Sequence, residues 1–215
     1  MAAEQLREPL LRTAPEPVSS EFVSPTQSPR LADLPQGLHI SIVTAIDPDQ
    51  LDEFYDLYLE AFGPLRTRAV ARQVLHRYEF AEQMNDPRIW KYVAKDDDQR
   101  PMGLSTLTRN LETVPWISPE YFAARFPEHT ARNAVYYWGF TLARPHRRGH
   151  RVFKHMLTAV VEHLAANKAV CSYDICAFNN ATMQFGDQIE ALTHRLTDVS
   201  FEVIDTQTYY AATFP

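Results

Sequence analysis

The feature that most constrains the fold is an aromatic strand that runs into a basic, glycine-containing turn and then into an amphipathic helix. The stretch begins at Ala134 and reads AVYYWGFTLARPHRRGHRVFKHMLTAVVEHL. Its first part has the composition of a strand, and its second part repeats apolar residues at the spacing of one helix face. The pattern predicts a strand at 134–144 and a helix at 151–167, with an apolar face made of Val152, Phe153, Met156, Leu157, Val160, Val161 and Leu164.

The turn between the two elements has the composition of an anion site. A helix that begins near His150 directs its first unpaired N–H groups, and the positive end of its dipole, back toward the turn. Arg147, Arg148 and Arg151 add guanidinium donors that suit phosphate. Gly149 allows a close approach of the backbone to a ligand, or a positive φ. An ordinary solvated strand-to-helix turn explains the same residues equally well.

Composition and charge narrow the class of protein. A chain of 215 residues has room for one sizeable core. The net charge of -6 argues against general binding to nucleic acids or anionic membranes, although residues 144–155 are locally basic. The N-terminus carries charged residues where a signal peptide or membrane span would be apolar, so we expect a cytoplasmic protein with no membrane association.

The two cysteines, Cys171 and Cys176, lie five positions apart in one predicted strand, so their side chains should face opposite sides of it. We therefore expect buried thiols and no disulfide framework. A nucleophilic role for either thiol is the less favoured interpretation.

Residues 1–37 are rich in proline and serine, and they predict a disordered or loosely docked arm. Residues 38–215 predict a single domain. An aromatic insert at 110–133 is either a lid over a substrate or a loop that packs its own rings onto the sheet. The expected strands are 39–45, 89–95, 102–108, 134–144, 171–178, 201–204 and 207–213, and the expected helices are 48–62, 67–84, 120–126, 151–167 and 181–196.

The order of these elements and the basic turn together resemble the GCN5-related N-acetyltransferase family, over residues 38–214. The family signature is Gln or Arg, two residues, Gly, one residue, then Gly or Ala, after a strand that ends hydrophobic-x-hydrophobic-x-Pro. Here the strand end is TLARP, and HRRGHR follows it, with His146 in place of Gln or Arg and Arg151 in place of the small residue. The resemblance implies a mixed α/β fold with a mostly antiparallel sheet of about seven strands flanked by helices.

The resemblance also implies acyl-coenzyme A as co-substrate. Backbone groups of Leu142 and Ala143 would face the pantetheine where the fourth and fifth strands diverge, and Asn179 would face it from the fifth strand. Asn179 is alternatively the N-cap of the next helix. The pyrophosphate would be held by the backbone amides of Arg147, Arg148, Gly149, His150, Arg151 and Val152. Arg151 either adds a contact to the phosphates or crowds them.

The implied reaction is direct attack of a small-molecule amine on the thioester, which requires a base for the amine and an acid for the thiolate. Asp174 and Glu112 are the candidate bases. The usual acid is a tyrosine in the fourth helix, but that place holds Phe185 or Gly186. Tyr173, Tyr136 and Tyr137 are the substitutes. His146 and His150 have a metal-compatible spacing, but nothing completes a metal site, so we expect none.

Two other functions stay open. In the first, the same fold takes its acyl group from an aminoacyl-tRNA or an acyl carrier protein, because the arginines of the turn suit a polyanion. Alternatively, the domain binds a ligand or partner without catalysis, since the acid tyrosine is missing. The sequence leaves the oligomeric state open, a homodimer included.

Overall fold

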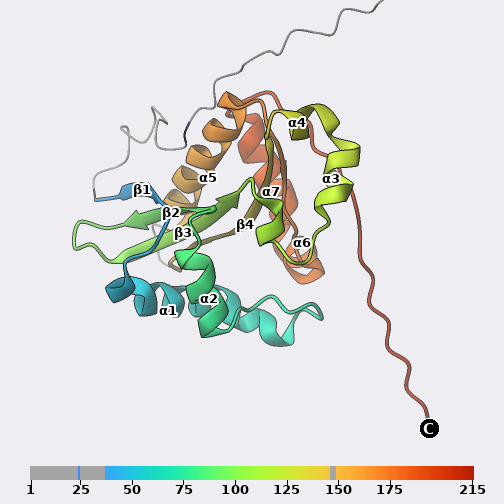
Figure 1. Cartoon of the computed structure of the whole chain (residues 1–215). Helices are drawn as coiled ribbons and strands as arrows, with labels where there is room; N and C mark the ends of the chain where they lie inside the picture. The colour runs from blue at the N-terminus through green and yellow to red at the C-terminus, as the bar shows by residue number, and fades with distance from the viewer. Residues whose placement is uncertain (1–23, 25–36, 146–148) are drawn as a thin grey trace, which may run out of the picture.

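The computed structural model describes Ser24 and residues 37–145 and 149–215 (Figure 1), so the predicted arm lies outside it except for Ser24 and Gly37. The described residues form a five-stranded sheet in the order β1-β2-β3-β4-β5. The pairings are antiparallel except for the last one, which is parallel. The expected fold class is confirmed, with fewer strands than the seven predicted. The strands are β1 (His39–Val43), β2 (Ile89–Lys95), β3 (Pro101–Thr108), β4 (Val135–Ala143) and β5 (Val170–Ser172).

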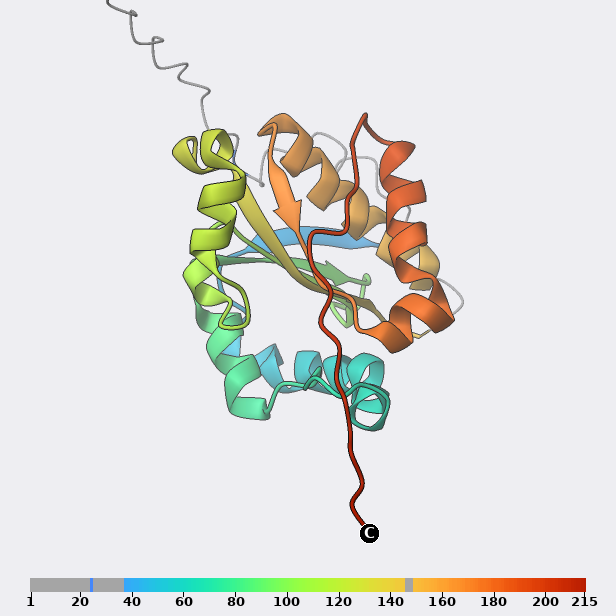
Figure 2. The ribbon, with the colours of Figure 1, turned by 90° about the vertical axis from the view of Figure 1, so that its right-hand side faces the viewer.

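Helices cover both faces of this sheet (Figures 1 and 2). The helices α1 and α2 lie on one face, and α5 and α7 lie on the other, while α3 and α4 belong to the insert beside the start of β4. The helices are α1 (Leu51–Phe62), α2 (Arg77–Asn85), α3 (Pro119–Arg125), α4 (Pro127–Ala131), α5 (Gly149–Ala166), α6 (Ala177–Met183) and α7 (Phe185–His194), with short 3-10 turns η3 (Pro48–Gln50), η4 (Gly63–Thr67) and η5 (Leu111–Thr113).

The prediction for β4 and α5 was correct to within two residues at each end. Because α5 buries its apolar stripe against β3 and β4, local periodicity was enough to locate it. Its buried residues include Val152, Met156, Leu157, Val160 and Val161.

The second predicted helix, 67–84, was wrong in its first half, since α2 begins at Arg77. The preceding loop is held in an irregular path by Tyr58, whose hydroxyl donates to Gln73 O at 3.1 Å and accepts from Leu75 N at 3.0 Å. Val74 is buried against α1 from this loop. Apolar residues at helical spacing therefore predicted a helix where tertiary contacts hold an irregular segment.

The last two predicted strands, 201–204 and 207–213, were also wrong: residues 200–215 contain no strand. Strand formation needs a neighbouring edge, and this segment instead crosses the molecule between α3 and α7 (Figure 2). It is anchored by Phe201 and Ile204, which pack on α7 and on the insert, and by an ion pair between Arg125 and Glu202 at 2.8 Å.

The region after β4 and α5 differs from its prediction as well. The strand predicted at 171–178 ends at Ser172, and α6 begins at Ala177. The helix predicted at 181–196 is divided in two at Gln184, which has a φ of 50° and therefore interrupts the helical hydrogen bonds.

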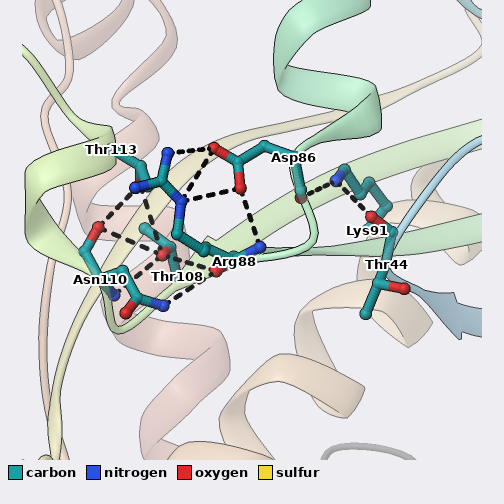
Figure 3. Close-up of polar contacts among 7 residues, drawn as sticks. All are labelled: Thr44, Asp86, Arg88, Lys91, Thr108, Asn110 and Thr113. Carbon is teal, nitrogen blue, oxygen red and sulfur yellow. Dashed lines mark hydrogen bonds and ion pairs between the residues drawn. The ribbon is translucent and has the colours of Figure 1, made fainter.

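A buried lysine joins the sheet to the segments beside it (Figure 3). Lys91 on β2 is 0% exposed, and its Nζ donates to Thr44 O at 2.8 Å and to Asp86 O at 2.6 Å. Burial lowers the pKa of Lys91 to about 8, and the charge of Asp86 opposes that shift. Asp86 O also accepts from Ile89 N at 3.2 Å. The ammonium joins β2 to the segments that hold Thr44 and Asp86, so the lysine is a structural cross-link.

The entry to the insert is fixed by a second group of contacts (Figure 3). Thr108 Oγ1 donates to Arg88 O at 2.9 Å and accepts from Asn110 N at 3.0 Å. Thr113 Oγ1 donates to Asn110 O at 2.8 Å. The first turn of the insert is therefore tied to the end of β3 and to the start of β2.

His163 on α5 predicts a loss of stability in mild acid. The ring is 2% exposed between Trp90 and Tyr136, with centroid distances of 5.4 Å to both. Burial, assisted by the charge of Arg109, lowers the pKa of His163 to about 4. Below about pH 6.5 the unfolded chain therefore binds a proton that the folded chain does not, so the free energy of unfolding falls as the pH falls toward 4.

Urea unfolding at pH 7 and pH 5 measures this effect. We expect His163 to lower the free energy of unfolding by about 2 kcal/mol when the pH falls from 7 to 5. The free energy of unfolding of His163→Gln should fall correspondingly less over this pH range. His150→Gln, at an exposed position of the same helix, should show the same fall as the unchanged chain. Equal losses in His163→Gln and the unchanged chain would contradict the assignment.

Candidate functional site

The first three residues of β4 pair with the three residues of β5, and the two chain segments then separate. Their paired residues are Val135 with Val170, Tyr136 with Cys171 and Tyr137 with Ser172. Beyond this point β4 continues to Ala143, while the chain after β5 turns away toward α6 (Figure 2). We call the opening between residues 138–143 and residues 173–176 the fork. Within it, this edge of β4 has no strand partner among the described residues.

Backbone direction shows which residues of β4 face the fork. Arg144 N donates to Met102 O at 2.8 Å, and Phe140 N donates to Thr106 Oγ1 at 3.2 Å, so both point toward β3. In an antiparallel strand, the backbone N–H and C=O groups of successive residues point alternately to the two edges of the strand. The N–H and C=O groups of Thr141 and Ala143 therefore face the fork, and those of Leu142 face β3. Of the two residues predicted for the pantetheine, only Ala143 has this orientation.

A bulge in β4 causes the difference. Ser105 pairs with Thr141 and Leu107 pairs with Trp138, so Gly139 and Phe140 together oppose Thr106. Such an extra residue reverses the direction of every backbone group that follows it. Without the bulge Leu142 would face the fork. A glycine inside a strand is a sequence signal for a bulge, and Gly139 lies at this position, so the signal was present in the sequence.

The open edge of β4 leads to the N-terminus of α5. A Cβ at Gly149 would lie 2.7 Å from Arg144 O, so glycine is needed here for the helix to pack against the end of the strand. The side chain of Arg144 points away from the N-terminus of α5, because its Nε donates to Pro101 O at 3.0 Å and its guanidinium pairs with Glu60 at 3.7 Å.

The other residues predicted for the pyrophosphate are only partly described. His146, Arg147 and Arg148 lie outside the described residues. His150 and Arg151 are exposed on the first turn of α5. The side chain of Val152 is buried in the core, so only its backbone is available to a ligand. The first N–H groups of this 18-residue helix have no partner within the helix and favour an anion.

On the face of the sheet that carries the insert, the inner end of the fork holds a hydrogen-bonded carboxylate. Trp116 Nε1 donates to the hydroxyl of Tyr137 at 2.8 Å, and that hydroxyl donates to Asp174 Oδ1. An indole N–H can only donate, so the proton of Tyr137 is left for Asp174. Burial, followed by the charge of Asp174, raises the pKa of Tyr137 well above its usual range. Asp174 is exposed, and its position is therefore fixed while it remains accessible.

The opposite face of the fork is aromatic. The rings of Trp138 and Tyr173 meet edge to face, with centroids 6.1 Å apart. Trp138 Nε1 donates to Ser105 Oγ at 2.7 Å, and that oxygen lies 2.6 Å from Thr141 Oγ1. Burial raises the pKa of Tyr173 to about 12. Tyr173 and Asp174 are thus neighbours in sequence but lie on opposite faces of the sheet.

Glu112 lies in the insert and not beside Asp174. It lines a cavity of about 320 Å³ under α3 and α4. Its carboxylate is within electrostatic reach of Arg88, whose pKa is raised first by Asp86 and also by Glu112. The other residues that line the cavity are Arg109, Leu111, Pro119, Glu120, Ala123, Thr130, Asn133 and Val135.

Asn179 lies inside α6 and not at the end of a strand, and the N-cap of that helix is Cys176. The N-cap interpretation of Asn179 was therefore wrong. Phe185 packs against Phe153, with centroids 5.4 Å apart, so the place expected for an acid tyrosine is apolar.

Both cysteines are free thiols, and they do not share a strand, because Cys176 lies beyond the end of β5. Burial raises the pKa of Cys171 to about 12, which disfavours a thiolate. Among the described residues, no three His, Cys, Asp or Glu side chains gather as metal ligands, and no helix has the length and apolar character needed to cross a bilayer.

No protein-family model and no curated protein sequence matches this chain. Several solved structures are similar to this chain, and three acetyltransferases are among them. An aminoglycoside acetyltransferase from an uncultured soil metagenomic sample, in complex with sisomicin, is 11% identical, with a TM-score of 0.48 over 82% of this chain and 97% of its own.

Two further structures are comparable. Aminoglycoside 6'-N-acetyltransferase AAC(6')-Ih from Acinetobacter baumannii is 12% identical, with a TM-score of 0.47 over 83% of this chain and 100% of its own. Ribosomal-protein-alanine N-acetyltransferase from Brucella melitensis biovar Abortus 2308 is 10% identical, with a TM-score of 0.44 over 80% of this chain and 99% of its own. Similarities at this level carry no argument about the activity or the substrates of this chain.

Proposed function

We propose that the chain is an N-acyltransferase that moves an acetyl or other acyl group from acyl-coenzyme A to an amine of a small molecule. The observation that carries the proposal is the fork, whose open β4 edge leads to the N-terminus of α5. A ligand that fits both parts has an extended, amide-bearing arm and a phosphate end. The arm pairs with the backbone groups of Thr141 and Ala143 as an added strand would, and the phosphates meet the N–H groups of the helix.

In this arrangement the thioester lies at the inner end of the fork, since the pairing of β4 with β5 closes the edge there. The amine attacks the thioester carbon from the side of Asp174, which takes a proton from the amine nitrogen as the new C–N bond forms. Backbone N–H groups of β4 stabilise the oxyanion. The intermediate then expels the thiolate of coenzyme A, which takes a proton from water, because Phe185 supplies no acid. The products are an amide and free coenzyme A.

Asp174 is the proposed base because its environment suits that role better than that of Glu112. Tyr137 and Trp116 hold Asp174 Oδ1 in place, and the other carboxylate oxygen is left for the amine. The alternative donors, aminoacyl-tRNA and acyl carrier protein, depend on the arginines of the turn, and Arg147 and Arg148 lie outside the described residues.

Thermal unfolding with coenzyme A or acetyl-coenzyme A tests the proposal. At a ligand concentration 100 times Kd, the folded state should gain about 2.7 kcal/mol, which raises Tm by roughly 5–10 °C in a domain of this size. Pantetheine without the phosphates should produce a much smaller shift. A chain that shows neither a Tm shift nor binding heat with coenzyme A would not be an acyl-coenzyme A enzyme.

Arg151 provides a matched variant for the same titration, because its side chain either adds a phosphate contact or crowds the phosphates. We expect the contact, and Arg151→Ala should weaken coenzyme A binding by about tenfold, the value of one charge-assisted hydrogen bond. Lys154→Ala, exposed one turn further along α5, is the control. Tighter binding by Arg151→Ala would show that the side chain crowds the site.

A further inference from the structure

The inner end of the fork is closed on one face by two aromatic rings. Trp138 is the first residue of β4 after the last pair with β5, and Tyr173 is the first residue after β5 ends. Their rings meet edge to face, with centroids 6.1 Å apart and planes at 74°. Aromatic carbon therefore fills the point at which the two strands part.

Both rings are held in place. Trp138 is 6% exposed, and its Nε1 is bound to Ser105 Oγ at 2.7 Å. Tyr173 is partly buried in the cluster between the sheet and the helices α5 and α7. Moving either ring would disturb a closely packed core. The wall formed by the rings of Trp138 and Tyr173 is therefore rigid on the scale of a methylene group.

The other face of the same point is also filled. Tyr137 is 1% exposed, and its ring meets that of Trp116 with centroids 6.1 Å apart. At the inner end of the fork, the three residue pairs between β4 and β5 leave no open strand edge for a ligand. An acyl group placed here is bounded on both faces and at its far end.

We propose that Trp138 and Tyr173 set the length of the acyl group and restrict the donor to thioesters of short acyl groups, acetyl or propionyl. This inference rests on the proposed function, because it assumes that the thioester lies at the inner end of the fork. Each further methylene has to displace aromatic carbon, and forcing extra methylenes into packed groups is unfavourable, so longer acyl chains should bind about tenfold or more weakly.

Tyr173 is the residue to change, because apolar side chains lie behind it. Removing its ring exposes these side chains to the fork and leaves an apolar space that an alkyl chain can fill. Trp138 is less suitable, since its indole also holds Ser105. The partly buried members of the same cluster include Phe153, Ile175, Phe185 and Leu192, and its buried members include Ile189.

Calorimetric titration of the full chain with coenzyme A, acetyl-coenzyme A and hexanoyl-coenzyme A tests the inference without any acceptor. We expect the unchanged chain to bind hexanoyl-coenzyme A about tenfold or more weakly than acetyl-coenzyme A. Tyr173→Ala should remove or reverse this preference. Tyr173→Phe, which keeps the ring and loses the hydroxyl, should retain it, and this variant separates the wall from any role of the hydroxyl as an acid.

Equal affinity of the unchanged chain for the two thioesters, or an unaltered preference in folded Tyr173→Ala, would overturn the inference and leave the proposed function intact. Should Tyr173→Ala fail to fold by near-ultraviolet circular dichroism, Tyr173→Leu keeps more apolar volume and answers the same question. Failure of the unchanged chain to bind coenzyme A itself would reject the inference together with the proposed function.

Discussion

Asp174→Asn is expected to lower kcat by about 10²- to 10⁴-fold, the usual contribution of a positioned general base. The carboxamide has almost the same shape, but it cannot take a proton from the attacking amine. Affinity for coenzyme A should change little, because Asp174 lies beyond the thioester and not along the arm of the ligand. The measurement is release of free thiol from acetyl-coenzyme A, with a panel of small primary amines as acceptors.

Glu112→Gln is the matched comparison, since the sequence offered both carboxylates as bases. Glu112 lies in the separate cavity of the insert, and its replacement should leave kcat near that of the unchanged chain. The reverse result, a large loss with Glu112→Gln and none with Asp174→Asn, would move the chemistry into the insert.

Gly103→Ala is expected to lower the free energy of unfolding by about 1–3 kcal/mol. A Cβ at Gly103 would lie 2.5 Å from Met156 Sδ, 2.9 Å from Val152 Cγ1 and 3.0 Å from Leu142 O. The methionine can move, but the other two contacts involve a branched side chain and the backbone of β4. The helix α5 must therefore shift away from the sheet, or β3 must distort.

Gly63→Ala is the control for this change. Nothing lies within 4 Å of a Cβ at Gly63, and its φ of -49° is helical, so alanine should be neutral or slightly stabilising. Urea unfolding of both variants at pH 7 gives the comparison. Equal stabilities would show that α5 does not pack on β3 as closely as described.

Much of the fold followed from local patterns in the sequence. The apolar stripe of α5 and the aromatic run of β4 were recognised because each element buries one face, and the spacing of its side chains records that face. The helix start near His150 was predicted for the same reason, since a helix N-terminus and its glycine are local features. The predicted strand 171–178 was wrong after Ser172, and the predicted helix 67–84 was wrong before Arg77. The pattern of apolar residues cannot distinguish a regular element from an irregular segment that packs well.

The candidate site was predicted less well, because its parts depend on register. The bulge at Gly139 decides that Thr141 and Ala143 face the fork. It arises from the pairing with β3, where Leu107 pairs with Trp138 and Ser105 pairs with Thr141, 31 and 36 positions apart. Asp174 was predicted as a carboxylate on the fifth strand, but the hydrogen bond that holds it comes from Tyr137, 37 positions away. The hydrogen bond from Trp116 to Tyr137 spans 21 positions. Trp116 lies within the predicted aromatic insert, and no local pattern indicates its contact with Tyr137.

By itself the sequence determined a strand, a basic turn and a helix in an α/β chain, since these depend on neighbours a few positions apart. The tertiary structure alone decided that β4 and β5 part after three pairs, that Asp174 and Tyr173 lie on opposite faces of the fork, and that two rings close its inner end. Those facts depend on which strands meet and in what register, and that choice is made by the packing of the whole core.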